Sequence, residues 1–334
     1  MEVSDSPPDR QARLVGATGD AVAIVTGRNG AWHVDLELGG SGAACVALDP
    51  RSPDTAYAGS RRGGVWRSDD GGATFGDAGL REHQIYSIAV SPVDGAVYAG
   101  CEPSMLWRSR DGGASWEELS ALRDIPSAPT WSFPPRPWTS HVRWIAASPH
   151  EADRLLVGIE LGGVMLSEDG GATWMDHRPG AQPDCHALAW HPSAEGRAYE
   201  AGGGGSAWSF DAGRSWRAAD EGRDRNYTWA LAVDPGDPDR WYLSASTGPG
   251  AAHRGGDPQA HLYRWEGEGP WRAVEAGLPQ PLDSMPYALA TSDGAIYVGL
   301  ADGRLYRSVD RGERWEQLQL EGDELAALIA LIAG

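Results

Sequence analysis

The chain of 334 residues contains no stretch approaching about 18 consecutive apolar residues, the length that a membrane-spanning helix requires. Its N-terminal segment, MEVSDSPPDRQARLV, lacks a cationic stretch followed by an apolar run, so a secretory leader is not predicted. We therefore expect a cytoplasmic protein that does not insert into a membrane.

Cysteine and positive charge are also scarce. The three cysteines, Cys45, Cys101 and Cys185, have no CxxC spacing of the kind that binds metals, and they fall in predicted inner strands, where a buried thiol is structural. The formal net charge is −19 and no basic run of five or more residues occurs. A phosphate backbone or an anionic membrane would be repelled, so nucleic acid and membranes are excluded as partners.

Glycine, proline and tryptophan are abundant, with 45, 23 and 16 copies. The chain is 41% hydrophobic, which is too apolar for disorder, while glycine and proline interrupt any long helix. This composition indicates a globular, loop-rich protein.

A short motif that ends in an aromatic residue recurs along the chain. Five copies are clear: GVWRSDDGGATF ending at Phe75, MLWRSRDGGASW at Trp116, VMLSEDGGATW at Trp174, AWSFDAGRSW at Trp216 and LYRSVDRGERW at Trp315. Two weaker copies are AIVTGRNGAW, ending at Trp32, and LYRWEGEGPW, ending at Trp271. Each motif belongs to a unit of four short β-rich runs separated by turn residues. Such units, repeated every 40 to 45 residues or so, are typical of β-propellers.

The repeats therefore predict a single all-β domain over residues 1–334, a seven-bladed β-propeller of four-stranded antiparallel blades. The predicted blades are 13–40 plus 323–333, 43–79, 84–120, 141–178, 184–219, 227–276 and 285–320.

The first unit lacks an inner strand, while the C-terminal LAALIALIAG stands alone after the last unit. We predict that this segment closes the ring as the inner strand of blade 1, since pairing would remove the open edges of a linear array. The alternative is a short Ala/Leu-rich helix packed on one face, which helix propensity alone favours.

The consensus Ser-x-Asp-x-Gly-x-Thr/Ser-Trp/Phe resembles the Asp-box of the BNR repeat family, which includes sialidases, sortilin-type receptors and photosystem-assembly-factor-like proteins. Clear matches are Ser68, Asp70, Gly72, Thr74 and Phe75, then Ser109, Asp111, Gly113, Ser115 and Trp116, with equivalents at Ser167 to Trp174 and Ser209 to Trp216. The copy from Ser308 to Trp315 departs by carrying Arg314. The resemblance implies a propeller, but an Asp in such a turn accepts hydrogen bonds from the turn itself, so these residues are expected to be structural.

Function is expected on the face opposite these turns, because both large insertions fall there. One is the Pro-rich connector from Ser120 to His141, which contains Trp131, and the other is the loop from Ala245 to His261. Long loops gathered at one rim of a rigid scaffold usually build a binding site.

Strand periodicity predicts which side chains line the channel mouth on that face. The candidate catalytic residues are Glu102, His141, Arg143, Glu160 and His186. Carboxylates beside arginine and imidazole suit general acid–base catalysis. Glu102, His141, Glu160 and His186 could instead hold one divalent metal such as Zn, Mn or Fe. A structural alternative is that the two glutamates pair with Arg143 and Arg61 to solvate the mouth.

The candidate ligand-binding residues at the same mouth are Arg61, Tyr86, Trp138, Asp184, Tyr227, Trp229 and Tyr287. Their aromatic rings could stack on a sugar or a planar ligand, or pack between blades. A sialidase-like site needs three arginines around a carboxylate, and the mouth offers Arg143 and Arg61 with Arg136 as the only third candidate. A typical sialidase is therefore not predicted.

Two functions remain open. The first is an intracellular hydrolase or lyase that acts on a small polar, sugar-like or aromatic molecule at the mouth, with or without a metal. The second is a non-enzymatic module in which the connector between Trp131 and Trp138 grips a peptide or protein partner.

Overall fold

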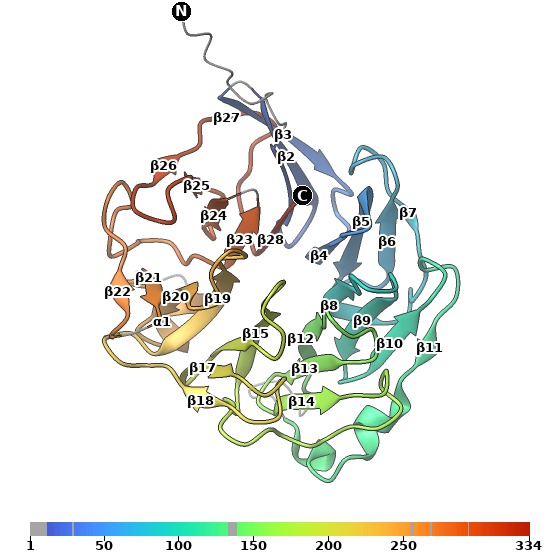
Figure 1. The fold of residues 1–334 in the computed structure, drawn as a ribbon. Helices are drawn as coiled ribbons and strands as arrows, with labels where there is room; N and C mark the ends of the chain where they lie inside the picture. The colour runs from blue at the N-terminus through green and yellow to red at the C-terminus, as the bar shows by residue number, and fades with distance from the viewer. Residues whose placement is uncertain (1–11, 29, 133–138, 255–256, 268, 293) are drawn as a thin grey trace, which may run out of the picture.

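The computed structural model describes residues 12–28, 30–132, 139–254, 257–267, 269–292 and 294–334. In this part of the chain, seven β-sheets stand around a central channel and form a closed ring (Figure 1). The protein is a seven-bladed β-propeller, as the repeats predict. The described helices are short and lie in connections between strands: η1 (Ser120–Asp124), η2 (Ala128–Thr130) and α1 (Pro249–His253).

Blades 2 to 7 follow one another along the chain, and each begins with its inner strand at the channel. Blade 2 contains β4 (Ala43–Asp49), β5 (Ser52–Ser60), β6 (Val65–Ser68) and β7 (Gly76–Asp77); blade 3 contains β8 (Gln84–Val90), β9 (Val97–Glu102), β10 (Leu106–Ser109) and β11 (Glu117–Glu118). Blade 4 contains β12 (Val142–Ala147), β13 (Leu155–Ile159) and β14 (Gly163–Ser167); blade 5 contains β15 (Cys185–Trp190), β16 (Ala198–Gly202), β17 (Gly205–Ser209) and β18 (Arg217–Ala218). Blade 6 contains β19 (Tyr227–Val233), β20 (Arg240–Ser246), β21 (His261–Glu266) and β22 (Arg272–Ala273); blade 7 contains β23 (Ala288–Ser292), β24 (Ala295–Gly299), β25 (Leu305–Ser308) and β26 (Glu316–Gln317).

Burial falls from the middle of each blade to its outer edge. Every residue of β13 and β14 is buried, whereas both residues of β7, β18 and β22 are exposed. Middle strands touch a neighbouring blade on both faces, so they are apolar without alternation. Blade 4 has no regular fourth strand in the described structure, where Met175 forms only an isolated bridge with Leu166.

The ring is closed by the C-terminal strand β28 (Ala330–Ala333), which pairs antiparallel with β1 (Ala12–Ala17). Blade 1 is completed by β2 (Val22–Arg28) and β3 (Ala31–Glu37), and the C-terminus lies beside this N-terminal blade (Figure 1). The predicted strand is confirmed and the alternative of a helix is wrong. Pairing supplies hydrogen-bond partners for the backbone groups of β1. A helical C-terminal segment would have left those groups without partners.

Blade 1 also has a fifth strand that the repeats do not predict. Strand β27 (Leu320–Gly322) runs parallel to β3, with Leu320 opposite Trp32. The last stretch of the chain thus covers both edges of blade 1, first the outer edge and then the inner one.

The repeated turns are held by side-chain hydrogen bonds within each turn. In blade 2, Asp70 Oδ1 accepts from the Thr74 backbone N–H at 2.9 Å, and Asp70 Oδ2 accepts from the Thr74 hydroxyl at 2.6 Å. Ser68 Oγ donates to Asp70 Oδ1 at 2.7 Å and accepts from the Gly72 N–H at 2.9 Å. In blade 7 Asp310 Oδ1 accepts from the Arg314 backbone N–H at 2.9 Å. The arginine side chain has no hydroxyl, so the second bond, which Thr74 makes in blade 2, has no equivalent. The turn aspartates are therefore structural parts of the hairpins.

Aromatic anchors join neighbouring blades. The Trp116 indole N–H donates to Ala78 O of the preceding blade at 2.7 Å, and the Trp271 indole N–H donates to Ala219 O at 2.6 Å. Trp271 makes this contact although its own hairpin has lost the Ser and Asp. The aromatic position is thus retained for packing between blades even where the turn chemistry is absent.

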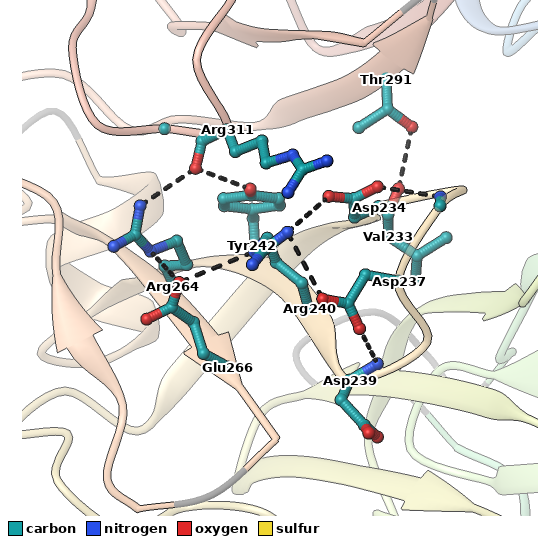
Figure 2. A network of polar contacts seen from close by, with 12 residues as sticks. Val233, Asp234, Asp237, Asp239, Arg240, Tyr242, Arg264, Glu266, Thr291 and Arg311 are labelled. Atoms are coloured by element: carbon teal, nitrogen blue, oxygen red, sulfur yellow. Dashed lines mark hydrogen bonds and ion pairs between the residues drawn. The ribbon is translucent and has the colours of Figure 1, made fainter.

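On the face that carries the turns, blades 6 and 7 share the polar network of Figure 2. The Arg240 guanidinium donates to Asp234 Oδ2 at 3.1 Å, and the Tyr242 hydroxyl donates across the blade boundary to Arg311 O at 2.9 Å. A second arginine, Arg264, donates to the same carbonyl at 3.0 Å. Charged groups on this face are used to hold turns in place.

The three cysteines are buried and form no disulfide. Burial raises the pKa of the Cys45 and Cys101 thiols to about 12, so both stay protonated. None of the helices that the structure describes has the length and hydropathy of a membrane span.

We predict that Asp111→Asn lowers the unfolding temperature by a few degrees at neutral pH. Hydrogen bonds from the Ser115 side chain and backbone, then from Ser109, lower the pKa of Asp111 to about 2. Its stabilising effect is present above the unfolded-state pKa of about 4 and is lost as pH falls through about 2. Thermal melts between those pH values should show that the unfolding temperatures of the variant and the native chain converge as the pH falls. Asp310→Asn changes the turn in which Arg314 supplies no hydroxyl to the aspartate, so it should lower the unfolding temperature less. An equal or larger decrease would contradict this account.

We predict that Leu328→Ala weakens ring closure. Leu328 is fully buried, and a Cβ placed on Gly16 or Gly299 would lie 2.6 or 2.2 Å from its side chain, so Leu328 fills the space over both glycines. Truncation leaves a cavity where the last blade meets the first and should cost about 2–5 kcal/mol of unfolding free energy. Denaturant titration measures the loss, and the half-buried Leu320→Ala on β27 serves as the control with a smaller effect.

Candidate functional site

A β-bulge near the start of five inner strands delivers side chains to the channel mouth. At each bulge the pairing with the second strand skips residues. The skipped residues are Ala44 in β4, Tyr86 in β8, Arg143 in β12, His186 in β15, and Trp229 with Ala230 in β19. A bulged residue has no partner in the ladder, and its side chain is turned away from the regular alternation. Four of the predicted site residues occupy these bulges.

The mouth brings together the charged residues that sequence analysis placed there. His141 lies between two carboxylates, with Nδ1 3.7 Å from Glu102 Oε2 and Nε2 3.7 Å from Glu160 Oε2. Arg143 Nε is also 3.7 Å from Glu160 Oε2. Glu102 Oε1 accepts a hydrogen bond from the Thr139 hydroxyl at 2.9 Å. Blades 3 and 4 therefore meet at a network of imidazole, carboxyl and guanidinium groups, and Glu160 contacts two of them.

Asp184 joins this cluster from blade 5. Its Oδ2 lies 3.4 Å from His186 Nε2, and its Oδ1 accepts from the Leu161 backbone N–H at 3.3 Å. One ligand atom from each of Glu160, Asp184 and His186 lies within 4.8 Å of the other two. Sequence analysis assigned Asp184 to ligand binding rather than to the metal set, and the structure places it nearer to His186 than a register argument could show.

The tautomer of His186 is fixed by its backbone contact. His186 Nδ1 lies 2.6 Å from Thr228 O, and because a carbonyl can only accept, Nδ1 carries a proton. The side chain is 0% exposed, and its Nε2 has no hydrogen-bond partner among the described residues. In a neutral imidazole, Nε2 therefore carries the lone pair, and Asp184 Oδ2 lies 3.4 Å from it.

The two neighbouring carboxyl groups differ in proton affinity. Burial raises the pKa of Glu160 above its usual range, although the positive charge of Arg143 opposes this shift. Burial also acts on Asp184, but the contact with His186 and the hydrogen bond from Leu161 outweigh it and lower the pKa. The same mouth thus holds one carboxyl that resists ionisation and one that favours it.

The predicted stacking residues are in contact with protein groups. The ring of Tyr86 lies 4.0 Å from the His141 ring, with Arg61 4.9 Å from its centroid on a cation–π contact. The ring of Trp229 has Arg143 at 4.4 Å and His186 at 4.4 Å. These aromatic rings position the charged groups of the mouth.

His253, from α1 in the loop insertion of blade 6, is a residue of the mouth that sequence analysis did not select. Tyr227 donates to His253 Nε2 at 2.7 Å, His253 Nδ1 donates to the Tyr287 oxygen at 2.7 Å, and Tyr287 donates to Ala252 O at 2.7 Å. Because the chain of donors ends on a carbonyl, every proton in it is assigned. Burial, with the nearby His186 and Arg143, lowers the pKa of His253 to about 4. A loop residue has no strand period, so only its location at this rim could have indicated the contact.

The part of the connector after blade 3 that precedes residue 133 packs against the core of blades 3 and 4. Trp131 is buried among Leu122 and Ile125, and Asp176 of blade 4 accepts a hydrogen bond from the Ser127 backbone N–H at 3.0 Å. The predicted ligand residue Trp138 lies outside the described residues.

Behind the mouth, the channel forms a cavity of about 410 Å³ with mainly aliphatic walls. Tyr86, Arg143, Trp229 and Tyr287 line its end at the mouth, and Pro50, Pro92, Pro149 and Pro192 line the other. Trp144 contributes a side chain to the channel and is 39% exposed. Arg143 therefore stands where the charged mouth meets an apolar cavity, of a size that suits a small molecule.

The fold and the mouth together define a propeller with a polar, partly buried site at one end of its channel. No protein-family model matches the sequence, and no curated protein matches it. Solved structures of similar fold include the GH74 xyloglucanase from Xanthomonas campestris, at 20% identity and a TM-score of 0.63, which covers 92% of this chain and 47% of that one. The chain spans about half the length of that enzyme, and 39% of an ancestral GH74 enzyme.

Two further structures match over most of both chains. One is YCF48 bound to a D1 peptide, at 16% identity and a TM-score of 0.58, covering 95% of this chain and 86% of that one. The other is the computationally designed Ika8 protein, at 14% identity and a TM-score of 0.58, covering 97% and 92%. An enzyme, a peptide-bound protein and a designed protein share the architecture, so the likeness shows the fold and leaves function to the site.

We predict that His253→Phe removes both hydrogen bonds of the imidazole and lowers the unfolding free energy by about 1–3 kcal/mol. The native His253 pKa lies below the unfolded value of about 6.5, so its contribution is present above that pH and is lost as pH falls toward 4. Between pH 6.5 and 4, the unfolding free energy of the variant should therefore fall less than that of the native chain. Denaturant titrations across this range measure it, with the exposed His33→Phe as control, and an unchanged decline would refute the role of His253.

Proposed function

We propose that the channel mouth is the active site of a hydrolase- or lyase-type enzyme that acts on a small molecule carrying an anionic group. One observation carries the proposal. Arg143 Nε, Glu160 Oε2 and His186 Nε2 are buried without hydrogen-bond partners among the described residues, and they belong to a single cluster. Other buried atoms of the described structure, such as Arg240 Nε and Trp241 Nε1, also lack a partner, but here a guanidinium, a carboxyl and an imidazole atom lie in one cluster. Such a grouping indicates a site that is completed by a ligand.

Arg143 is the residue that we expect to bind the anionic group. It lines the cavity and is held over Trp229. Its Nε lies 3.7 Å from Glu160 Oε2, which is too far for a hydrogen bond. The aliphatic channel behind it suits the less polar part of the same molecule.

The chemistry would be carried out by the carboxylates and imidazoles of the mouth, Glu102, His141, Glu160, Asp184 and His186. The chain contains no lysine, so a lyase mechanism through a lysine Schiff base is excluded. A site of the sialidase type is not part of this proposal, since the described mouth contributes two arginines, Arg61 and Arg143, and Arg136 lies outside the described residues.

The family proposal rests on the turns. Five hairpins carry the Ser, Asp and Gly pattern, and their hydrogen bonds are consistent with the Asp-box of BNR-repeat propellers. We infer membership of that family on this basis.

A non-enzymatic scaffold is the second candidate. The structure of YCF48 with a bound D1 peptide supports a peptide-binding role for propellers of this shape. In this chain Trp131, which was expected to grip a partner, is buried in the blade 3–4 core, so Trp131 itself offers little surface to a partner.

We expect Arg143→Gln to weaken substrate use. Screening with 4-nitrophenyl and 4-methylumbelliferyl glycosides, uronides and carboxylate esters should identify a substrate among the anionic members. Loss of a charge-assisted hydrogen bond costs about 1.5–3 kcal/mol, so kcat/KM should fall about 10- to 100-fold.

The matched control is Arg110→Gln, an exposed arginine on the turn face, which should leave kcat/KM unchanged. The proposal is wrong if the anionic members show neither turnover nor binding, or if Arg143→Gln binds them as tightly as the native chain does.

A further inference from the structure

We infer that Glu160, Asp184 and His186 form a binding site for one divalent transition-metal ion, Mn²⁺ or Zn²⁺. This site deepens the proposed function, which it would supply with a metal cofactor. The ligand set differs from the one that the sequence suggested, because Asp184 enters it while Glu102 and His141 stand outside.

The donor atoms already face one another. His186 Nε2 and Asp184 Oδ2 are 3.4 Å apart, which matches the separation of about 3.4 Å expected for two ligands that are each about 2.1 Å from a tetrahedral ion. Glu160 completes the group within 4.8 Å. The Glu160 carboxylate would have to move toward the other two donors to reach bonding distance.

Two of the three donors are buried and have no hydrogen bond at the atom in question. His186 is 1% exposed and Glu160 is 7% exposed, and neither His186 Nε2 nor Glu160 Oε2 has a hydrogen-bond partner in the described structure. A buried lone pair on Nε2 close to carboxylate oxygens is unfavourable unless a cation or a proton lies between them.

His186 and Asp184 are each oriented by a second side-chain contact of the kind that metal ligands have. Thr228 O accepts from His186 Nδ1 and leaves Nε2 as the donor atom for a metal. The Leu161 N–H holds Asp184 Oδ1 and leaves Oδ2 on the side of His186. Glu160 is fixed through its backbone, whose N–H donates to His141 O at 3.1 Å. Such supporting contacts preorganise a metal site and raise its affinity.

Formal charge also favours a cation. The mouth carries three carboxyl groups, Glu102, Glu160 and Asp184, against two guanidinium groups, Arg61 and Arg143. A bound metal ion would hold Glu160 ionised. With all three carboxyls ionised and the imidazoles neutral, these groups sum to one negative charge, and a divalent ion would make the total positive. A mouth with positive charge is the one that suits an anionic substrate.

The donor set selects the class of ion. Carboxylate oxygens alone would suit Ca²⁺ or Mg²⁺, but an imidazole nitrogen beside two carboxylates favours a first-row transition metal. Chelator-treated protein titrated with MnCl₂ or ZnCl₂ in a calorimeter should bind one equivalent, while MgCl₂ and CaCl₂ should bind at least about tenfold more weakly.

Substitutions separate this ligand set from its neighbours. His186→Gln and Asp184→Asn should each weaken Mn²⁺ binding by at least about tenfold, whereas Glu102→Gln should leave the affinity within about twofold. Pulsed electron paramagnetic resonance of the bound Mn²⁺ should show coupling to an imidazole ¹⁴N, and this coupling should vanish in His186→Gln.

Gly203 offers a test that removes no ligand. A Cβ on Gly203 would lie 2.1 Å from Asp184 Oδ2, so Gly203→Ala should displace that carboxylate and weaken Mn²⁺ binding about 10- to 100-fold. The adjacent Gly204→Ala is the control, because its Cβ would meet only the Gln182 side-chain end at 2.9 Å. Circular dichroism melts confirm that each variant folds.

The inference is overturned if none of these ions binds, if Mn²⁺ binds without ¹⁴N coupling, or if Glu102→Gln loses as much affinity as His186→Gln. Failure here is distinguishable from failure of the proposed function. Turnover of an anionic substrate that depends on Arg143 but survives chelation would overturn the metal site and leave the proposed function standing. Metal binding in a protein that turns over none of the substrates would overturn the proposed function and leave the metal site standing.

Discussion

Closure of the ring is the constraint on which the rest of the structure depends. The pairing of β28 with β1 joins residues from opposite ends of the chain, Leu14 with Ala333 through Ala17 with Ala330. A propeller without this pairing would expose an open sheet edge, and its first and last blades would have no fixed separation. The channel, its mouth and the distances across that mouth exist because this contact sets the ring's circumference.

The scaffold keeps its two faces chemically separate. On one face, aspartates and arginines are used in turns and in the network around Arg240. On the other face, bulges at Tyr86, Arg143, His186 and Trp229 interrupt the strand ladders and present side chains to the channel. Buried atoms without a hydrogen-bond partner in the described structure occur on both faces, Arg240 Nε among them. Where the bulges converge, however, Arg143 Nε, Glu160 Oε2 and His186 Nε2 lie in one cluster, and this grouping points to function.

Sequence reasoning recovered most of the residues of the mouth but not how they are arranged. Strand ends identified Glu102, His141, Glu160 and His186, because a strand's polarity tells which end of it lies at the mouth. The sequence placed Asp184 in the ligand-binding set and His253 in a loop at the same rim, but it did not predict their contacts. The contact of Asp184 with His186 depends on the rotation of a bulged strand, and the contacts of His253 depend on the path of the loop. The alternation of side chains along a strand predicts neither of these contacts.

The sequence by itself determined the number of blades, the turns and the strand that closes the ring. These features are repeated or local, so each copy can be identified from a few residues around Asp70 or Asp111. Tertiary structure alone decided which donors meet, that Trp229 packs against Arg143 instead of standing free, and that His186 Nε2 faces Asp184. Those contacts join different blades, and their distances follow from ring curvature and bulge geometry, which no single repeat contains.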